Sequence, residues 1–233
     1  MPLPRILLLL LGAVLTACAT REPPPTAGRD WSGAIADRER WNGVVSVYRC
    51  GVDTVVTRLG FGELLLWSAE TLEPTVLTQT RTASGARFDS GEVMLWMKGD
   101  GALHARGGGE TVECTLDGRE SLRIEGVMDG AALLALGSSP EWSLLIFDDG
   151  TAVRGRVSVP RSAVDAELAG PAPERGNIGR RLVYEVADGE HTARIDLESV
   201  VCVDPVAGER FPFAATLVLD GATLAGCGQR IAP

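Results

Sequence analysis

Short apolar runs of strand length recur along the chain from residue 44 onward, and turn residues separate them. Asp-Gly pairs lie between such runs at 149–150, 188–189 and 220–221, and this dipeptide supplies the positive φ angles of a type I′ hairpin turn. The pattern predicts an all-β chain built from hairpins. The runs are VVSVYRC, TVVTRL, ELLLW, VMLWM, ETVECTL, WSLLIF, AVRGRVSV, RLVYEV, ARIDL and ATLVLDG.

Helical periodicity is scarce in this sequence. SAVDAEL (162–168) is a candidate for a short helix, and ADRERW (36–41) for a single helical turn. The triple glycine at 107–109 lies between two strand-like runs and no helix follows it. We therefore interpret it as a loop, and not as a nucleotide-binding turn.

The N-terminal segment has the outline of a secretory signal. Arg5 precedes an apolar run at 6–15 that is too short to span a bilayer comfortably, and small residues follow it. Leu15-Thr16-Ala17-Cys18 resembles the lipobox of bacterial lipoproteins. The resemblance implies that 1–17 is removed and that Cys18 carries acyl chains such as palmitate, which anchor the protein in a membrane. Ala19, in place of Asp, favours the outer membrane, with the protein facing the periplasm. The alternative is a plain signal with an incidental cysteine.

The residues after Cys18 read as a tether over 18–41, with polyproline character at 23–25. The remaining chain of roughly 190 residues is long enough for two small domains. We expect one domain over 42–117, a linker over 118–129 and a second domain over 130–233.

The cysteines support this division. Apart from Cys18, the chain has Cys50, Cys114, Cys202 and Cys227, an even number suited to an oxidising compartment. Three pairings are possible, and an early and a late pair are the natural choice, stabilising the fold by about 4 and 3.5 kcal/mol on the chain-entropy model. A zinc site is the weaker alternative, because there is no C-x-x-C and the only histidines are His104 and His191. Both histidines are expected to be structural or surface residues.

Composition narrows the possible partners. The formal net charge is −9, and removal of Arg5 with the signal leaves −10. An acidic chain is a poor match for nucleic acid, so no nucleic-acid partner is expected. The sequence contains no cofactor motif and no metal-ligand pattern, and we expect neither a cofactor nor a metal.

Two short motifs carry the candidate chemistry: ASGARF (83–88) and WMKGD (96–100). A serine and a lysine can form a catalytic dyad, but the Ser-x-x-Lys spacing places Arg87, which cannot act as a base, where the lysine is needed. A G-x-S-x-G elbow is also missing. We therefore expect no catalytic residue and no enzyme activity.

The region 42–117 resembles the membrane-bound and periplasmic inhibitors of c-type lysozyme. The matching residues are VYRC (47–50), ASGARF (83–88), LWMKGDGA (95–102) and Cys114. The chain departs from the family pattern at Thr82, which replaces a serine, at Phe88, which replaces a tyrosine, and at Gly101, where an acidic residue is common. The resemblance implies a small antiparallel β-barrel that is closed by a disulfide.

The resemblance also implies a site and a partner. Ser84 and Lys98 would enter the cleft of a cationic, host-derived c-type lysozyme and contact its two catalytic carboxylates. Gly85 would allow close approach of the backbone, and Gly99 would permit the turn that aims Lys98. Arg87 is expected to support the loop, and Phe88 and Trp96 are expected to belong to the core. The acidic net charge would steer the inhibitor toward such a partner.

The region 130–233 resembles a second lipoprotein module, the META-like β domains, whose function is poorly defined. The resemblance implies a β-rich domain with one disulfide and with Trp142 in or near its core. It carries no chemistry, so a binding surface and a spacer both remain open. The rival to lysozyme inhibition is a non-enzymatic envelope binding or stress-related lipoprotein with a different target. The matching residues are Glu141-Trp142-Ser143-Leu144, Cys202-Val203-Asp204, Gly208, Phe211-Pro212 and Leu224-Ala225-Gly226-Cys227-Gly228.

Overall fold

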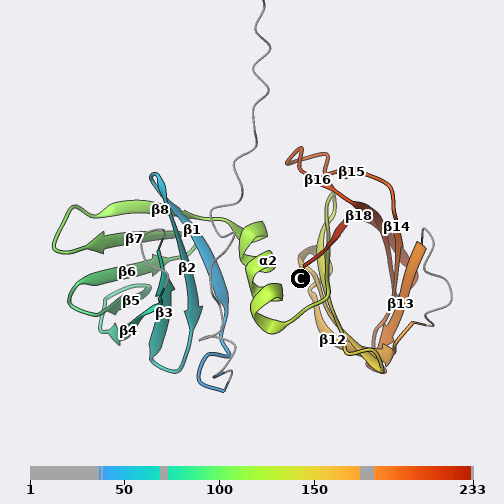
Figure 1. The fold of residues 1–233 in the computed structure, drawn as a ribbon, viewed down its shortest axis with the longest axis horizontal. Coiled ribbons are helices and arrows are strands. Elements are labelled where there is room, and N and C mark those ends of the chain that lie inside the picture. The colour runs from blue at the N-terminus through green and yellow to red at the C-terminus, as the bar shows by residue number, and fades with distance from the viewer. Residues whose placement is uncertain (1–36, 38, 69–72, 174–180, 232–233) are drawn as a thin grey trace, which may run out of the picture.

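A computed structural model describes residues 37, 39–68, 73–173 and 181–231 (Figure 1). The signal segment, Cys18 and most of the tether lie outside the described residues. The fold confirms the all-β prediction: two closed, eight-stranded antiparallel barrels follow each other along the chain, and each contains one disulfide. In the described residues, no helix has the length and apolar character needed to cross a membrane.

Barrel 1 is an up-and-down meander in which each strand pairs with the next. It closes where β1 pairs with β8, and Cys50 lies directly opposite Cys114 in that register. The disulfide joins these two residues, whose Cα atoms are 4.2 Å apart, so it links the first strand of the barrel to the last. The strands are β1 (Val45–Cys50), β2 (Asp53–Leu59), β3 (Glu63–Trp67), β4 (Thr75–Thr80), β5 (Ala86–Asp89), β6 (Val93–Lys98), β7 (Gly101–Arg106) and β8 (Val112–Leu116).

Barrel 2 follows the same meander with one insertion, and closes where β18 pairs with β9. The insertion is a short hairpin of β15 (Cys202–Val203) and β16 (Arg210–Phe211), and the Cys202–Cys227 disulfide ties it to β18. Both disulfides therefore match the predicted early and late pairs. The barrel strands are β9 (Leu133–Ser138), β10 (Glu141–Asp148), β11 (Ala152–Val159), β12 (Val164–Pro171), β13 (Arg181–Ala187), β14 (Thr192–Glu198), β17 (Phe213–Leu219) and β18 (Ala222–Arg230).

The segment expected to be a linker is an α-helix, α2 (Gly118–Asp129), which lies between the two barrels (Figure 1). The Asp117 side chain accepts a hydrogen bond from Glu120 N at the start of the helix, and Gly130 ends it in the left-handed conformation. The sequence thus contained both a helix start and a helix stop signal.

Helix α2 packs against the outer surfaces of both barrels. Ile124 and Met128 lie in an apolar cluster with outward-facing residues of β1, β2 and β3, among them Trp67. Leu122 packs on a second cluster, which belongs to β9, β10 and the inserted hairpin. This explains why ELLLW and WSLLIF are continuous apolar runs: each strand has the barrel core on one face and the helix region on the other.

Ion pairs join barrel 1, the helix and barrel 2. The buried guanidinium of Arg58 in β2 donates to Asp129 at the end of α2, with an N–O distance of 2.7 Å. Arg156 in β11 pairs with Glu125 at 2.6 Å and lies 3.4 Å from Asp129. The two barrels are therefore connected through one shared helix by charged as well as apolar contacts.

Two local predictions need correction. SAVDAEL is not a helix: a single 3-10 turn, Pro160–Ser162, precedes β12, because residues 164–171 pair along their whole length with β11. The three Asp-Gly pairs predicted to form type I′ turns do lie in hairpin connections, but of these three only Asp220–Gly221 has positive φ at both positions. At the other two connections the aspartate instead caps the loop, accepting bonds from Thr151 N and Ala152 N or from Glu190 N and His191 N.

Candidate functional site

The structure brings the Ser84 loop and Lys98 together. The loop at 83–85 leads into β5, and β5 pairs with β6 so that Ala86 lies opposite Met97. Gly85 has a φ of +70°, and a Cβ atom built on it would lie 2.2 Å from the Met97 carbonyl oxygen and 3.1 Å from Lys98 Cγ. The loop backbone therefore rests directly on the last residues of β6, and only glycine permits this approach.

The Ser84 backbone is held by two hydrogen bonds. Its carbonyl oxygen accepts one bond from the Trp96 indole nitrogen at 2.8 Å and another from the Thr82 hydroxyl at 3.1 Å. Thr82 thus donates its hydroxyl to this loop. The Ser84 side chain itself is exposed, so its hydroxyl is presented to solvent.

Lys98 is the last residue of β6 and is exposed. Its ammonium nitrogen lies 3.5 Å from the centroid of the Trp96 ring, within the range of a cation–π interaction. Gly99 follows with a φ of +57°, which makes the turn into β7. Within the described part of the chain, Lys98 forms no ion pair with a carboxylate, so its charge is available to a partner.

Lys98 is also the only lysine in the chain. The sequence has 22 basic residues, and the other 21 are arginines. A lysine ammonium is a compact point charge with three rotatable donors, whereas an arginine guanidinium is a planar fork. The single ammonium therefore lies beside the Ser-Gly loop in a chain that otherwise uses guanidinium.

Arg87 lies one residue into β5, where its cross-strand partner is Trp96. Its guanidinium pairs with Asp89 at 2.9 Å, and its carbonyl oxygen accepts a bond from the Thr80 hydroxyl at 3.4 Å. The Gly91 amide and the Arg87 guanidinium hold the pKa of Asp89 below its ordinary value. Asp89 lies on the same strand as Arg87 and Thr80 lies on the neighbouring β4, so these contacts stay within barrel 1, which agrees with a supporting position at the base of the loop.

Trp96 was expected in the core, and the structure corrects this. Val93 and Leu95 of β6 point into the barrel, so the alternation of the strand places Trp96 on the outer face, half-buried. Phe88 is buried in the core as predicted, at 3% exposure. The run VMLWM is apolar on both faces, so Lys98, which shares the face of Trp96, is the one sequence signal in this strand for an outward-facing Trp96.

The histidines and cysteines do not converge on a metal-like cluster. The four described cysteines are all in disulfides, and no group of three or more histidine, cysteine or acidic side chains with metal-binding geometry occurs among the described residues. His104 is buried in barrel 1, where burial and then Arg106 lower its pKa. His191 is at the surface, where its ring pairs with Asp220 at 2.7 Å and this bond raises its pKa.

The motifs of the second region are structural in barrel 2. Trp142 is buried as expected, and its indole nitrogen donates to the Ala225 carbonyl at 3.0 Å. Asp204 is buried in the inserted hairpin and accepts bonds from Ser138, Arg119 and the amides of Val206 and Ala207. Burial alone would raise the pKa of Asp204, but these bonds outweigh it and hold the pKa well below its ordinary range.

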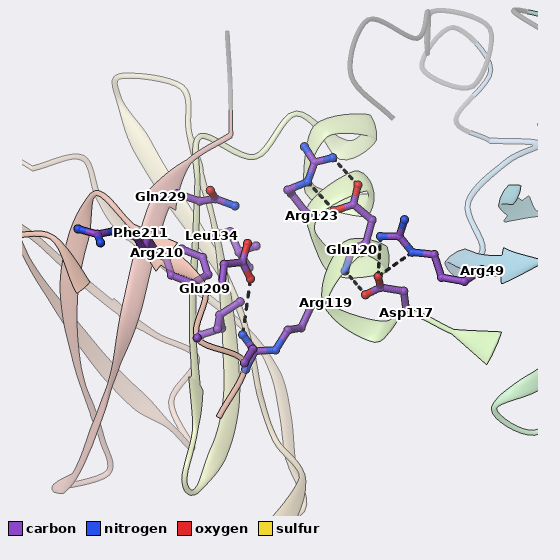
Figure 2. A pocket seen from close by; sticks show the side chains of 13 residues that line it. Arg49, Asp117, Arg119, Glu120, Arg123, Leu134, Glu209, Arg210, Phe211 and Gln229 are labelled. Carbon is purple, nitrogen blue, oxygen red and sulfur yellow. Dashed lines mark hydrogen bonds and ion pairs between the residues drawn. The ribbon is translucent and has the colours of Figure 1, made fainter. Parts of the chain in front are cut away.

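A cleft of about 680 Å³ opens between the start of α2 and the outer surface of barrel 2 (Figure 2). Its arginines are largely neutralised: Arg49 pairs with Asp117 at 2.9 Å, and Arg123 with Glu120 at 2.5 Å. Arg119 lies 3.8 Å from Glu209. The cleft is thus lined by internal ion pairs and differs in character from the exposed Ser84–Lys98 site.

The Ser84–Lys98 site lies on strands that α2 does not cover. The helix packs against β1, β2 and β3, whereas β5 and β6 lie on the far side of barrel 1 (Figure 1). A globular partner therefore has access to the site without displacing the helix or barrel 2. No protein-family model, curated protein or solved structure matches this chain.

Proposed function

We propose that this protein is an outer-membrane lipoprotein that binds and inhibits c-type lysozyme. The observation that carries the proposal is the exposed pairing of the Ser84 loop with Lys98, the only lysine, on one open side of barrel 1. The order of the motifs, and the disulfide that closes the barrel around them, also support it.

The proposed mechanism follows from what a retaining glycosidase needs. One carboxylic acid must be protonated, to donate to the leaving group, and a second carboxylate must be charged. The ammonium of Lys98 pairs with the charged carboxylate and lowers the pKa of the acid, so that less of the enzyme has the proton it needs. The Ser84 loop occupies the space that a sugar ring requires, and its exposed hydroxyl can bond to a carboxylate.

The charge of the whole chain favours the encounter. With a net charge of −9, or −10 once the signal with Arg5 is removed, the protein attracts a cationic enzyme over several ångströms, which accelerates association at low salt. Lys98 is then a local positive charge on an acidic protein, suited to a carboxylate-lined cleft within a basic surface.

The test is a turbidity assay of bacterial lysis by c-type lysozyme. The inhibitor is the chain from residue 18 onward with Cys18→Ala. This chain contains both barrels and α2. A fragment that ends at residue 117 would lack the helix and would expose the apolar residues of barrel 1 that the helix covers. Inhibition at micromolar protein is expected. If the chain does not inhibit lysozyme at this concentration, the rival hypothesis remains, an envelope lipoprotein with a different target.

A pair of variants separates the site from general charge. Lys98→Met removes the ammonium and keeps most of the stem, and we expect inhibition to weaken by roughly 30-fold or more, the scale of an interface hot spot. Arg161→Met changes the net charge equally at an exposed position of barrel 2. It should inhibit nearly as well as wild type, with only a small change in association rate.

A further inference from the structure

Trp96 contacts both parts of the candidate site. Its indole N–H donates to the Ser84 carbonyl at 2.8 Å, and its ring face lies 3.5 Å from the Lys98 ammonium. We propose that Trp96 is the positioning residue of the inhibitory site, which fixes the serine loop and the lysine relative to each other before the enzyme arrives. This inference deepens the proposed function and depends on it for its effect on inhibition.

The position of Trp96 follows from the strand. Residues 96 and 98 are two apart in β6, so their side chains share the outer face, and the lysine stem can lie along the indole. On the paired strand, Arg87 lies opposite Trp96, so the loop before β5 comes close to the same outer face, where the Ser84 carbonyl accepts the indole N–H. One half-buried ring therefore meets both groups.

The N–H bond defines the shape of the loop. Residues 83–85 lie outside regular strand pairing, and the described structure gives Ser84 two bonds, one from Thr82 within the loop and one from Trp96 outside it. The Trp96 bond is thus the side-chain link between the loop and β6. Without it, the Gly85 contact remains, but the orientation of the Ser84 peptide plane is less restricted.

The contact with the Trp96 ring reduces the conformational entropy that the Lys98 side chain loses when it binds a partner. A lysine side chain has many rotamers, and fixing it in an interface opposes binding. Over the Trp96 ring the ammonium is already confined in the free protein. Lys98 nevertheless remains exposed, so its outward N–H groups are open to a carboxylate. The aromatic face attracts the cation without neutralising it, which an aspartate in the same place would do.

The single lysine allows a direct test. Reductive dimethylation with ¹³C-formaldehyde keeps the positive charge and labels Lys98 and the N-terminal amine only, and the Lys98→Met variant identifies the Lys98 signal. In wild type, we expect the methyl signal of Lys98 to be displaced upfield by the ring current of Trp96. Trp96→Leu should return the signal to the position of a free dimethyl-lysine, and Trp96→Phe should keep part of the displacement.

The second readout is inhibition. We expect Trp96→Leu to inhibit about 10- to 30-fold more weakly than wild type, since it loses both the N–H bond and the ring. Trp96→Phe, which keeps a ring, should lose only about 5-fold. In a Lys98→Met background the effect of Trp96→Leu should become smaller. Phe61→Leu is the matched control: it removes an aromatic ring that is fully exposed in the β2–β3 turn, and should change neither readout.

The outcomes separate the two proposals. An undisplaced Lys98 signal in wild type, or full inhibition by a folded Trp96→Leu variant, would overturn the positioning role. Stronger inhibition by Trp96→Leu would mean that the ring restrains a lysine that must leave it to bind. If wild type does not inhibit lysozyme at all, the proposed function fails, and the methyl signal alone then decides whether Trp96 holds Lys98.

Discussion

Replacing Gly85 by alanine tests the close approach on which the site is built. Gly85 has a φ of +70°, and its added Cβ would lie 2.2 Å from the Met97 carbonyl oxygen. Since real Cβ contacts are essentially never shorter than 3.0 Å, the loop must move away from β6 by at least about 0.8 Å. This displacement carries Ser84 with it.

Gly85→Ala has two separate effects, one on the stability of the fold and one on binding. An L-residue in the left-handed conformation costs roughly 1–2 kcal/mol, and this loss appears in the stability of the fold. The displacement of the loop affects binding instead, because a shift of about 1 Å in a fitted site can weaken function by as much as 100-fold. We expect Gly85→Ala to inhibit lysozyme at least about 10-fold more weakly, which corresponds to 1.4 kcal/mol.

Gly62→Ala is the matched control. Gly62 has a similar φ of +73°, in the turn between β2 and β3, but no atom of the described residues lies within 4 Å of its added Cβ. Urea unfolding should show a loss of roughly 1–2 kcal/mol for this variant, while the turbidity assay shows wild-type inhibition. If a folded Gly85→Ala variant inhibits as well as Gly62→Ala, the fit between the loop and β6 is not needed and the reasoning is wrong.

Three other changes have defined outcomes. Lys98→Arg keeps the charge but exchanges the point ammonium for a wider fork, and we expect inhibition between that of wild type and Lys98→Met in the turbidity assay. His104 is buried with its pKa lowered, first by burial and then by Arg106. As the pH falls, His104 is therefore protonated in the unfolded chain before it is protonated in the folded protein. The free energy of unfolding, measured with urea, should fall from pH 7 to 5. His104→Leu should flatten that slope and add about 1 kcal/mol, because Nε2 has no hydrogen-bond partner among the described residues. Asp204 has a depressed pKa, so the stability that its charge contributes is present above about pH 4 and is lost as the pH falls further. Asp204→Asn should cost about 3 kcal/mol at pH 7 and remove that acid dependence.

Much of the fold could be predicted from local patterns. The strand-like runs and the Asp-Gly pairs at 149–150, 188–189 and 220–221 define hairpins, and a chain of hairpins with an early and a late cysteine pair is consistent with two successive barrels. SAVDAEL was misread because residues with helical preference were weighed without β11, whose pairing over eight residues decides their conformation. Helix α2 was missed although Asp117, Glu120 and Gly130 mark its ends.

The site was less accessible to sequence reasoning. The motifs indicated Ser84 and Lys98, but the role of Trp96 depends on which face of β6 it occupies, and the run VMLWM is apolar on both faces. The Asp204 contacts could not be foreseen, because its partners Ser138 and Arg119 are 66 and 85 residues away in the chain. Such contacts are set by the packing of the helix and the hairpin on barrel 2, and no local pattern encodes them.

The central claim is that barrel 1 occupies the active cleft of c-type lysozyme. A calorimetric titration tests it most directly, with lysozyme titrated by the soluble chain in the absence and presence of a chitin oligosaccharide that fills the cleft. If the two ligands compete, sugar at 100 times its own Kd should weaken the apparent affinity about 100-fold. An affinity that the sugar leaves unchanged would show that the protein binds lysozyme elsewhere, and would contradict the account.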